Sequence, residues 1–259
     1  MSGSNQSVIQ RLGRLLGRIA VFPPPLRQHF STPEFYTFMR DEIGRYSPRY
    51  ARTRVRIEPA DRLDGLSGGA ILAFLHYGSF FLSGGAITHQ LGRCYTAMVS
   101  RRNLIPEVMS VQDIAYWRRV HIQVSRLYRA PVLFSDQPAR DAIRWLGAGN
   151  LLGMALDVRE HGQRHKEARL RFLGEDIYMQ LGPARLAHAA GVPLVPMSIR
   201  YDAGTRCHRL SLGAPIWVDE SPHATTQRLL DFLQQDPAQA PEQLFHDIAR
   251  TFRTPAQGG

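Results

Sequence analysis

The sequence predicts an α/β protein in which helices flank a mostly parallel mixed sheet. Residues 70–75 form a run of six apolar residues, a length typical of a strand buried on both faces. Similar runs follow at 95–100, 151–156 and 192–199, and helical patterns separate them. Strands that alternate with helices favour a parallel sheet covered on both faces.

The remaining elements complete this pattern. Helices are predicted at about 79–91, 111–128, 139–146, 182–190, 224–234 and 241–252. A short strand is expected at 131–134, a charged loop at 158–169 and an antiparallel edge strand at 208–212. We expect a basic helical segment, residues 1–56, followed by an α/β domain, residues 57–259, and we expect the two to form one structural unit.

The N-terminal segment contains a short amphipathic pattern. Ile9, Leu12, Leu16 and Ile19 recur at spacings of three and four, which predicts a helix over 8–20 with one apolar face. Such a helix, with arginines on another face, can lie on an anionic membrane or pack against the domain. Both alternatives remain open.

The charge of the chain favours an anionic partner. The formal net charge is +10, and all the basic residues except Lys166 are arginine. Membrane surfaces, nucleic acids and acidic carrier proteins all fit this charge. No nucleic-acid-binding motif or interleaving of aromatic and basic residues is present, so we do not expect nucleic acid as the partner.

Two cysteines, Cys94 and Cys207, lie far apart and predict neither a disulfide framework nor a zinc site. We expect a reduced, cytosolic setting and no signal peptide. The stretch 65–92 has no charged residue, but His76 and several glycines and serines interrupt it. We therefore interpret it as strand, loop and helix rather than as a membrane span.

Polar side chains follow three of the predicted strands. His76 ends the first, Arg101, Arg102 and Asn103 follow the second, and Asp157 ends the strand at 151–156. The carboxyl ends of parallel strands share one edge, where open α/β sheets bind ligands. A histidine there can act as a general base, an arginine pair can hold an anion, and Asp157 can orient the histidine or pair with an arginine.

Each of these residues also has a structural interpretation. His76 can be a hydrogen-bonded core residue, Asp157 a turn residue, and the arginines a solvated strand end. His161 and His165 have a metal-ligand spacing but no third ligand at a clear spacing, so no metal site is expected. No Walker loop or dinucleotide fingerprint predicts a cofactor.

Taken together, these motifs are similar to those of the lipid A lauroyl/myristoyl acyltransferases, within the lysophospholipid acyltransferase superfamily. Residues 70–82, AILAFLHYGSFFL, resemble the strand, histidine, glycine and aromatic segment of that family. Ser100–Asn103 resembles its arginine and asparagine block, and 151–157, LLGMALD, its strand ending in aspartate. Residues 172–196 resemble the block that closes the acyl site, and the likeness extends over about 8–215.

One position departs from the family pattern. Members carry an acid five residues after the histidine, and here that position is Phe81. The resemblance implies that the histidine deprotonates the acceptor while the acid orients it. Three explanations are open: another acid, with Asp157 as the candidate, replaces it; the acceptor is an amine; or the protein binds without turnover.

The resemblance implies a glycerophospholipid-acyltransferase-like fold and an acyltransferase. The enzyme would move a fatty acyl group from acyl carrier protein or coenzyme A to a hydroxyl or amine, with no other cofactor. His76 and Asp157 are the expected catalytic residues. The expected substrate-binding residues are Tyr77, Gly78, Ser79, Arg101, Arg102, Asn103 and Gly182. The alternative is a non-catalytic protein that binds acyl chains or a carrier protein.

The location follows from the same comparison. The family has a membrane-spanning N-terminal anchor, and the sequence offers only the helix at 8–20 in its place. We therefore expect a cytoplasmic protein that is soluble or attached peripherally to the anionic inner face of the inner membrane.

Overall fold

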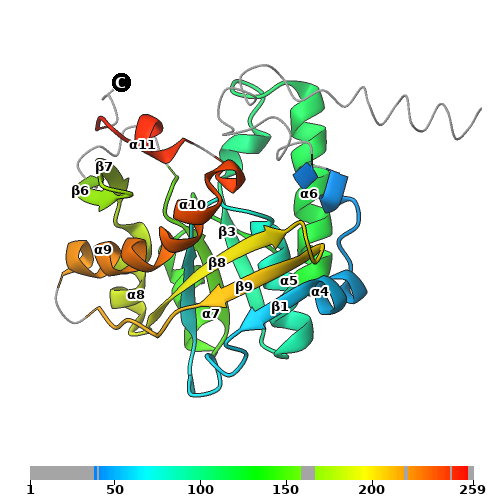
Figure 1. Ribbon diagram of the computed structural model, residues 1–259, viewed down its shortest axis with the longest axis horizontal. Coiled ribbons are helices and arrows are strands. Elements are labelled where there is room, and N and C mark those ends of the chain that lie inside the picture. Colours follow the sequence, from blue (N-terminus) through cyan, green and yellow to red (C-terminus); the bar gives the residue numbers. More distant parts are fainter. Residues whose placement is uncertain (1–37, 40, 159–166, 219–220, 246, 256–259) are drawn as a thin grey trace, which may run out of the picture.

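The structure is a computed structural model, and it describes residues 38–39, 41–158, 167–218, 221–245 and 247–255. The helix expected at 8–20 and the two histidines of the charged loop lie outside these ranges. The chain forms a seven-stranded sheet between two layers of helices (Figure 1). The strands follow the order β1-β9-β8-β2-β5-β3-β4.

The strands of this sheet are β1 (Val55–Glu58), β2 (Ala70–Phe74), β3 (Tyr95–Val99), β4 (Leu133–Phe134), β5 (Leu151–Ala155), β8 (Leu194–Asp202) and β9 (Cys207–Leu212). Strands β8, β2, β5, β3 and β4 are parallel to one another. Strand β9 is antiparallel to β8, and β1 is parallel to β9. The prediction of a mostly parallel mixed sheet flanked by helices is confirmed.

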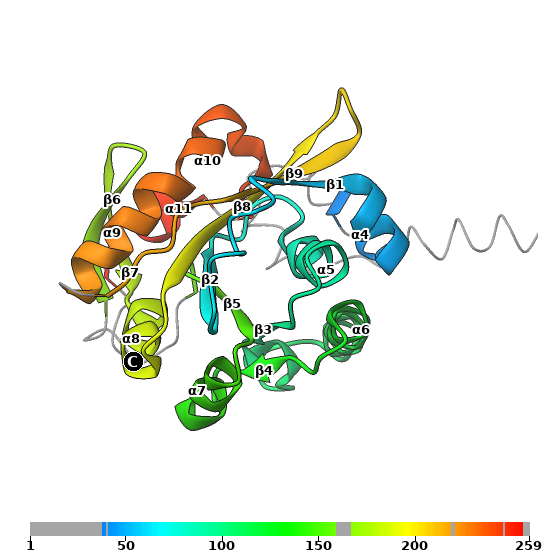
Figure 2. The ribbon, with the colours of Figure 1, turned by 90° about the horizontal axis from the view of Figure 1, so that it is seen from below.

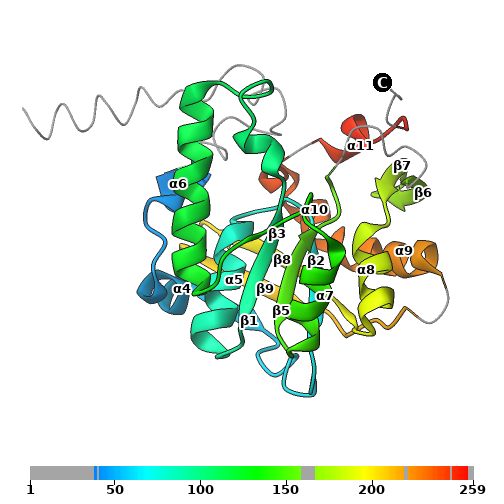
Figure 3. The same cartoon turned by 180° about the vertical axis from the view of Figure 1, so that it is seen from behind.

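Alternate residues of β2 explain why the sheet has two helical layers. Ala70, Leu72 and Phe74 pack with α4 (Pro48–Arg54), α5 (Phe80–Gln90) and α6 (Val111–Tyr128). Ile71 and Ala73 pack with α7 (Ala139–Gly147), α8 (Gly182–Ala190) and α9 (Pro222–Leu233). Because successive side chains of a strand point to opposite faces, a continuous apolar run serves both cores. Figures 2 and 3 show the sheet between these two layers.

Three predicted elements differ from the structure. Residues 241–252 do not form one helix: they contain the short helices η3 (Pro241–Gln243) and α11 (Ile248–Thr251), and Leu244, which follows η3, bridges to Tyr77. The strand at 208–212 is antiparallel but not an edge, because β1 pairs with its outer side. The end of the predicted loop at 158–169 belongs to a hairpin, β6 (Glu167–Phe172) and β7 (Glu175–Gln180).

The segment before residue 57 packs into the same core as the domain. Met39, Ile43, Ala51 and Val55 are buried together with side chains of α5. The division at residues 56 and 57 remains a prediction, but the described part of the first segment is not separate from the α/β core.

Gly153 leaves β5 room for a buried tyrosine. A Cβ at this position would lie 1.9 Å from the hydroxyl oxygen of Tyr95, whose ring is fully buried. We therefore expect Gly153→Ala to lower the free energy of unfolding by about 1–3 kcal/mol, the usual cost of overpacking. Urea denaturation measures this loss. Gly68→Ala is the control, since a Cβ at Gly68 meets nothing within 4 Å; equal losses in the two variants would contradict the explanation.

Candidate active site at the carboxyl ends of β2 and β5

The register of two neighbouring strands brings His76 beside Asp157. In the parallel pair β2 and β5, Ala70 is opposite Leu151 and Phe74 is opposite Ala155. Two residues after Phe74 comes His76, and two residues after Ala155 comes Asp157, where the backbone has left the sheet. The same pairing therefore places these two side chains next to each other, although they are 81 residues apart in the sequence.

The connections after these two strands run in opposite directions. From β2 the chain continues through α5 to β3, on one side of β5. From β5 it continues through the β6–β7 hairpin and α8 to β8, on the other side of β2. This reversal is a topological switch point, the place where open α/β sheets form their binding crevice.

His76 and Asp157 form a direct pair. Nδ1 of His76 lies 2.8 Å from Oδ1 of Asp157, and the backbone N–H of His76 donates to the same carboxylate at 3.0–3.1 Å. Because an ionised carboxylate only accepts hydrogen bonds, this geometry places the imidazole proton on Nδ1. The Asp157 side chain is fully buried, whereas that of His76 is 21% exposed. A buried acid thus orients a histidine that reaches solvent.

Aromatic rings surround the imidazole of His76. The ring of Phe80 meets it edge-on at 4.6 Å between centroids, and those of Phe245 and Phe74 lie at 5.6 and 6.0 Å. Packing of this kind restricts rotation of the imidazole. It adds to the orientation that Asp157 supplies.

Phe81 is a core residue in the structure. Its side chain is buried in the cluster that contains α5 and α6, and its ring packs 4.3 Å from that of Phe80. The position that holds an acid in the family pattern is therefore apolar here. The acid that contacts the histidine is instead Asp157, which follows the neighbouring strand β5.

The three residues after His76 lie inside the protein. The Tyr77 side chain is buried, and Ser79 is fully buried with its hydroxyl donating to Glu42. Gly78 has a φ of +55°, and a Cβ there would lie 1.9 Å from the carbonyl oxygen of Ile199, so only glycine fits. The two buried side chains support the turn that carries His76, and contact of Tyr77, Gly78 or Ser79 with substrate remains a prediction.

The arginine block lies on the neighbouring helix η1 (Arg101–Leu104). Nε of Arg101 donates to Asp136 at 2.8 Å, and its guanidinium lies 4.1 Å from the centroid of the Phe134 ring. Arg102 is exposed, and Asn103 is half-buried. Arg101 is thus held by one contact with β4 and one with the turn that follows it, and anion binding by these residues remains a prediction.

A cavity of about 330 Å³ opens beside Asp157. Its lining comes from the ends of β3, β5 and β7, from the residue after β4 and from the start of α8, and it includes Leu156, Val158 and Gly182. Most of the lining side chains are apolar, and Ser100, Ser135, Gln180 and Arg185 add polar groups. Among the predicted substrate-binding residues, Gly182 lines this cavity.

A buried acid that the sequence analysis did not single out lies behind the turn. Oε1 of Glu42 lies 2.5 Å from Nε2 of His208 and accepts from the Tyr50 hydroxyl at 2.8 Å, and the second carboxylate oxygen accepts from Ser79. Burial by itself would raise the pKa of Glu42, but the bonds from His208, Ser79 and Tyr50 outweigh burial and lower that pKa below its usual value.

No signal in the sequence pointed to Glu42, because its partners come from 37 and 166 residues away. It joins the N-terminal segment, β9 and the start of α5 into one network.

Within the described ranges, no three histidine, cysteine or acidic side chains gather as metal ligands. In that same part of the chain, no helix is both long enough and apolar enough to cross a bilayer. The stretch 65–92 folds as strand, turn and helix, as predicted.

Comparisons with known proteins point to one family. A family model described as bacterial lipid A biosynthesis acyltransferase matches residues 26–254. Among solved structures, the 1-acyl-sn-glycerophosphate acyltransferase PlsC from Thermotoga maritima is similar over 80% of both chains, with 11% sequence identity and a TM-score of 0.45. No curated protein matched the sequence.

The Glu42 network predicts a pH-dependent loss of stability. A hydrogen bond to a charged group is typically worth about 1.5–3 kcal/mol, so Glu42→Gln, which removes the charge, should lower the free energy of unfolding by about that amount at neutral pH. Because the folded-state pKa lies below the usual 4.5, the contribution of Glu42 is complete above pH 4.5 and disappears as the pH falls through the folded-state pKa. Urea denaturation at several pH values measures the difference between wild type and variant.

Glu175→Gln is the control for this experiment, because Glu175 is exposed and its ion pair with Arg253 spans 3.8 Å. A difference between wild type and Glu42→Gln that stays constant down to low pH would contradict the role of the ionised carboxylate.

Proposed function

Because this chain belongs to the bacterial lipid A biosynthesis acyltransferase family, and is therefore an acyltransferase, we propose that it uses His76 as the general base that activates its acceptor. The pair formed by His76 and Asp157 at 2.8 Å is the observation that carries this proposal. With the proton of the neutral ring on Nδ1, the lone pair that a base needs is on Nε2.

The proposed reaction is transfer of a fatty acyl group from a thioester to a hydroxyl or amine. Nε2 of His76 takes the proton of the acceptor as its oxygen or nitrogen attacks the thioester carbonyl. The tetrahedral intermediate then collapses, its carbon–sulfur bond breaks, and the imidazolium returns the proton to the leaving thiolate. Asp157 holds the Nδ1–H and stabilises the positive charge that forms on the ring between the two steps.

The cavity beside Asp157 supports acyl binding. It opens at the carboxyl ends of β3 and β5, the edge from which His76 also projects, and its lining is mainly apolar. We place the acyl chain in this cavity, with the thioester carbonyl directed toward His76. The bulk of Phe81 lies outside it, in the core on the α5 side of the sheet.

Acyl carrier protein or coenzyme A is the proposed donor. Carrier proteins are acidic and coenzyme A carries phosphates, so either suits a chain of net charge +10. The same charge supports peripheral contact with an anionic membrane on the cytoplasmic side. No metal or other cofactor enters the proposed reaction.

The first prediction is that His76→Ala abolishes transfer. General bases contribute about 10²–10⁴-fold to rate, so the rate of acyl transfer should fall by at least about 100-fold. Mass spectrometry of the acylated product, with a panel of hydroxyl and amine acceptors and both thioester donors, measures it. His223→Ala is the control, since His223 is exposed and contacts the carbonyl of Arg169. Near-wild-type turnover in His76→Ala would overturn the mechanism.

The second prediction concerns the acid. Asp157→Asn keeps an oxygen that accepts from the His76 backbone but removes the charge that stabilises the imidazolium, so we expect a loss of at least about 100-fold in kcat. Asp231→Asn, at an exposed position that accepts from Gln227, is the control. An unchanged kcat in a folded Asp157→Asn variant would show that Asp157 is structural.

The same assay separates catalysis from binding alone. A protein that only binds acyl chains or a carrier protein would retain the thioester in a direct binding measurement and form no product with any acceptor. Product that disappears in His76→Ala, while thioester binding persists, would support catalysis.

A further inference from the structure

A segment near the C-terminus is hydrogen-bonded to the turn that carries His76. This segment, residues 235–245, contains α10 (Gln235–Gln239) and η3. The backbone N–H of Phe245 donates to the carbonyl of His76 at 2.8 Å, and that of Gly78 donates to the carbonyl of Gln243 at 2.9 Å. Tyr77, between them, forms an isolated bridge with Leu244. Each residue of the turn 76–78 is therefore tied to the same segment.

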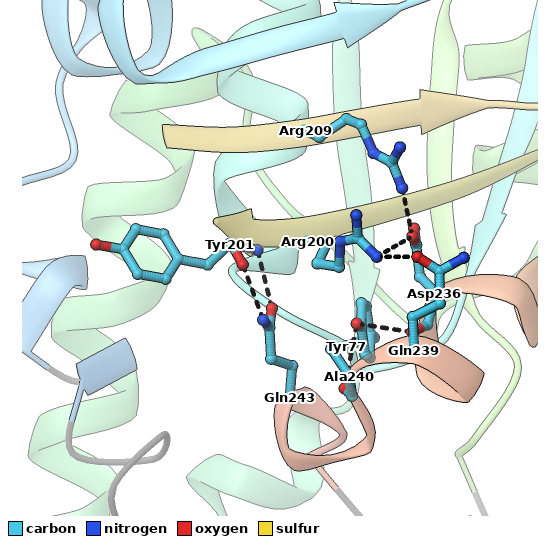
Figure 4. A network of polar contacts seen from close by, with 8 residues as sticks. All are labelled: Tyr77, Arg200, Tyr201, Arg209, Asp236, Gln239, Ala240 and Gln243. Carbon is cyan, nitrogen blue, oxygen red and sulfur yellow. Dashed lines mark hydrogen bonds and ion pairs between the residues drawn. The ribbon is translucent and has the colours of Figure 1, made fainter. Parts of the chain in front are cut away.

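The side chain of Tyr77 adds a further contact between the turn and the segment 235–245. Its hydroxyl lies 3.2 Å from the carbonyl oxygens of both Asp236 and Ala240, at the two ends of the turn of chain around α10 (Figure 4). Burial, together with the nearby Asp236 carboxylate, raises the pKa of this hydroxyl above its usual value, so it stays a donor at neutral pH. Tyr77 is not among the residues that line the cavity, and its hydroxyl points into the segment 235–245.

The gripping segment is in turn anchored to the sheet. The amide side chain of Gln243, which is buried, accepts from the backbone N–H of Tyr201 at 2.8 Å and donates to its carbonyl at 2.9 Å. Asp236 accepts from Arg209 at 2.8 Å and lies 3.6 Å from Arg200, which also donates to Gln239 (Figure 4). These partners belong to β8 and β9, so the segment is fixed to rigid strands.

On the basis of the function proposed above, we propose that Gln243 and Tyr77 are positioning residues for acyl transfer: through them, β8 and the segment 235–245 set the place of the base, His76. The Asp157 carboxylate fixes the imidazole from the β5 side, and the clamp formed by residues 235–245 fixes the backbone of the turn from the β8 side. Phe245 completes the clamp with its ring beside the imidazole.

The clamp makes a specific kinetic prediction because it shares no residue with the cavity. The cavity lining comes from the ends of β3 and β5, from β7 and from α8, none of which belongs to 235–245. Loosening the clamp should therefore displace the base without weakening binding of the acyl donor. A displacement of about 1 Å in a catalytic group can cost on the order of 10²-fold in rate.

Two variants test the clamp. Tyr77→Phe removes only the hydroxyl, and Gln243→Met removes the amide bonds to Tyr201 while keeping a side chain of similar length. In both we expect kcat to fall by about 10- to 100-fold with the KM of the thioester donor unchanged. We also expect the ¹⁵N NMR signal of the His76 Nδ1–H to shift or broaden, since its bond to Asp157 would no longer be held in one geometry.

Thr96→Val is the matched control. It removes a buried hydroxyl that donates to the carbonyl of Pro131 at 2.6 Å, so it should lower stability with no change in kcat or in the His76 signal. Equal stability losses in all three variants with wild-type kcat throughout would overturn the clamp as a positioning device. If Gln243→Met does not fold, Tyr77→Phe alone tests the clamp, because the aromatic ring at position 77 still fills the core.

The clamp and the proposed role of His76 can be refuted independently of each other. Loss of transfer in His76→Ala, combined with full kcat in Tyr77→Phe, would refute the clamp and leave the base in place. Full transfer in His76→Ala would refute the base itself, whatever the clamp variants show.

Discussion

The parallel pairing of β2 with β5 is the interaction on which the site depends. Hydrogen bonds of the sheet fix Phe74 beside Ala155, and the backbone N–H of Leu156 still donates to the carbonyl of Phe74 at 2.8 Å past the last paired residues. This register sets the distance between His76 and Asp157. A slip of one residue would turn every side chain of β2 to the opposite face, so the two apolar cores that fix the register also keep His76 beside Asp157.

The sequence predicts the parts of this arrangement that depend on local patterns. The apolar run at 70–75 and the helix at 111–128 follow from periodicity, and His76 and Asp157 follow from their places at strand ends. The pairing of β2 with β5 does not follow, because two other strands lie between them in the chain. Neighbourhood within a sheet is decided by the packing of the whole domain, which no local pattern encodes.

The features that the sequence did not predict correctly have related causes. Leu244, Ile248 and Phe252 recur at helical spacing and are all buried, yet Leu244 forms a bridge with Tyr77, and only the four residues from Ile248 to Thr251 are helical, with Phe252 as their C-cap. Tertiary contacts with the His76 turn override the helical preference there. Glu42 was missed because its meaning depends on His208 and Ser79, which the fold alone brings to it. A buried acid in a basic segment has no sequence signature until its partners are known.

The clamp also affects when the site can form. Tyr77 and Asp236 are 159 residues apart, so the turn that carries the histidine gains this support only after residues 235–245 have been made. During synthesis the β2–β5 pair can assemble once residue 155 has been made, whereas the backbone of His76 meets its partner only after Phe245 has been made. A nascent or clipped chain that lacks residues 235–245 would contain all seven strands of the sheet but none of the contacts that hold the turn at His76.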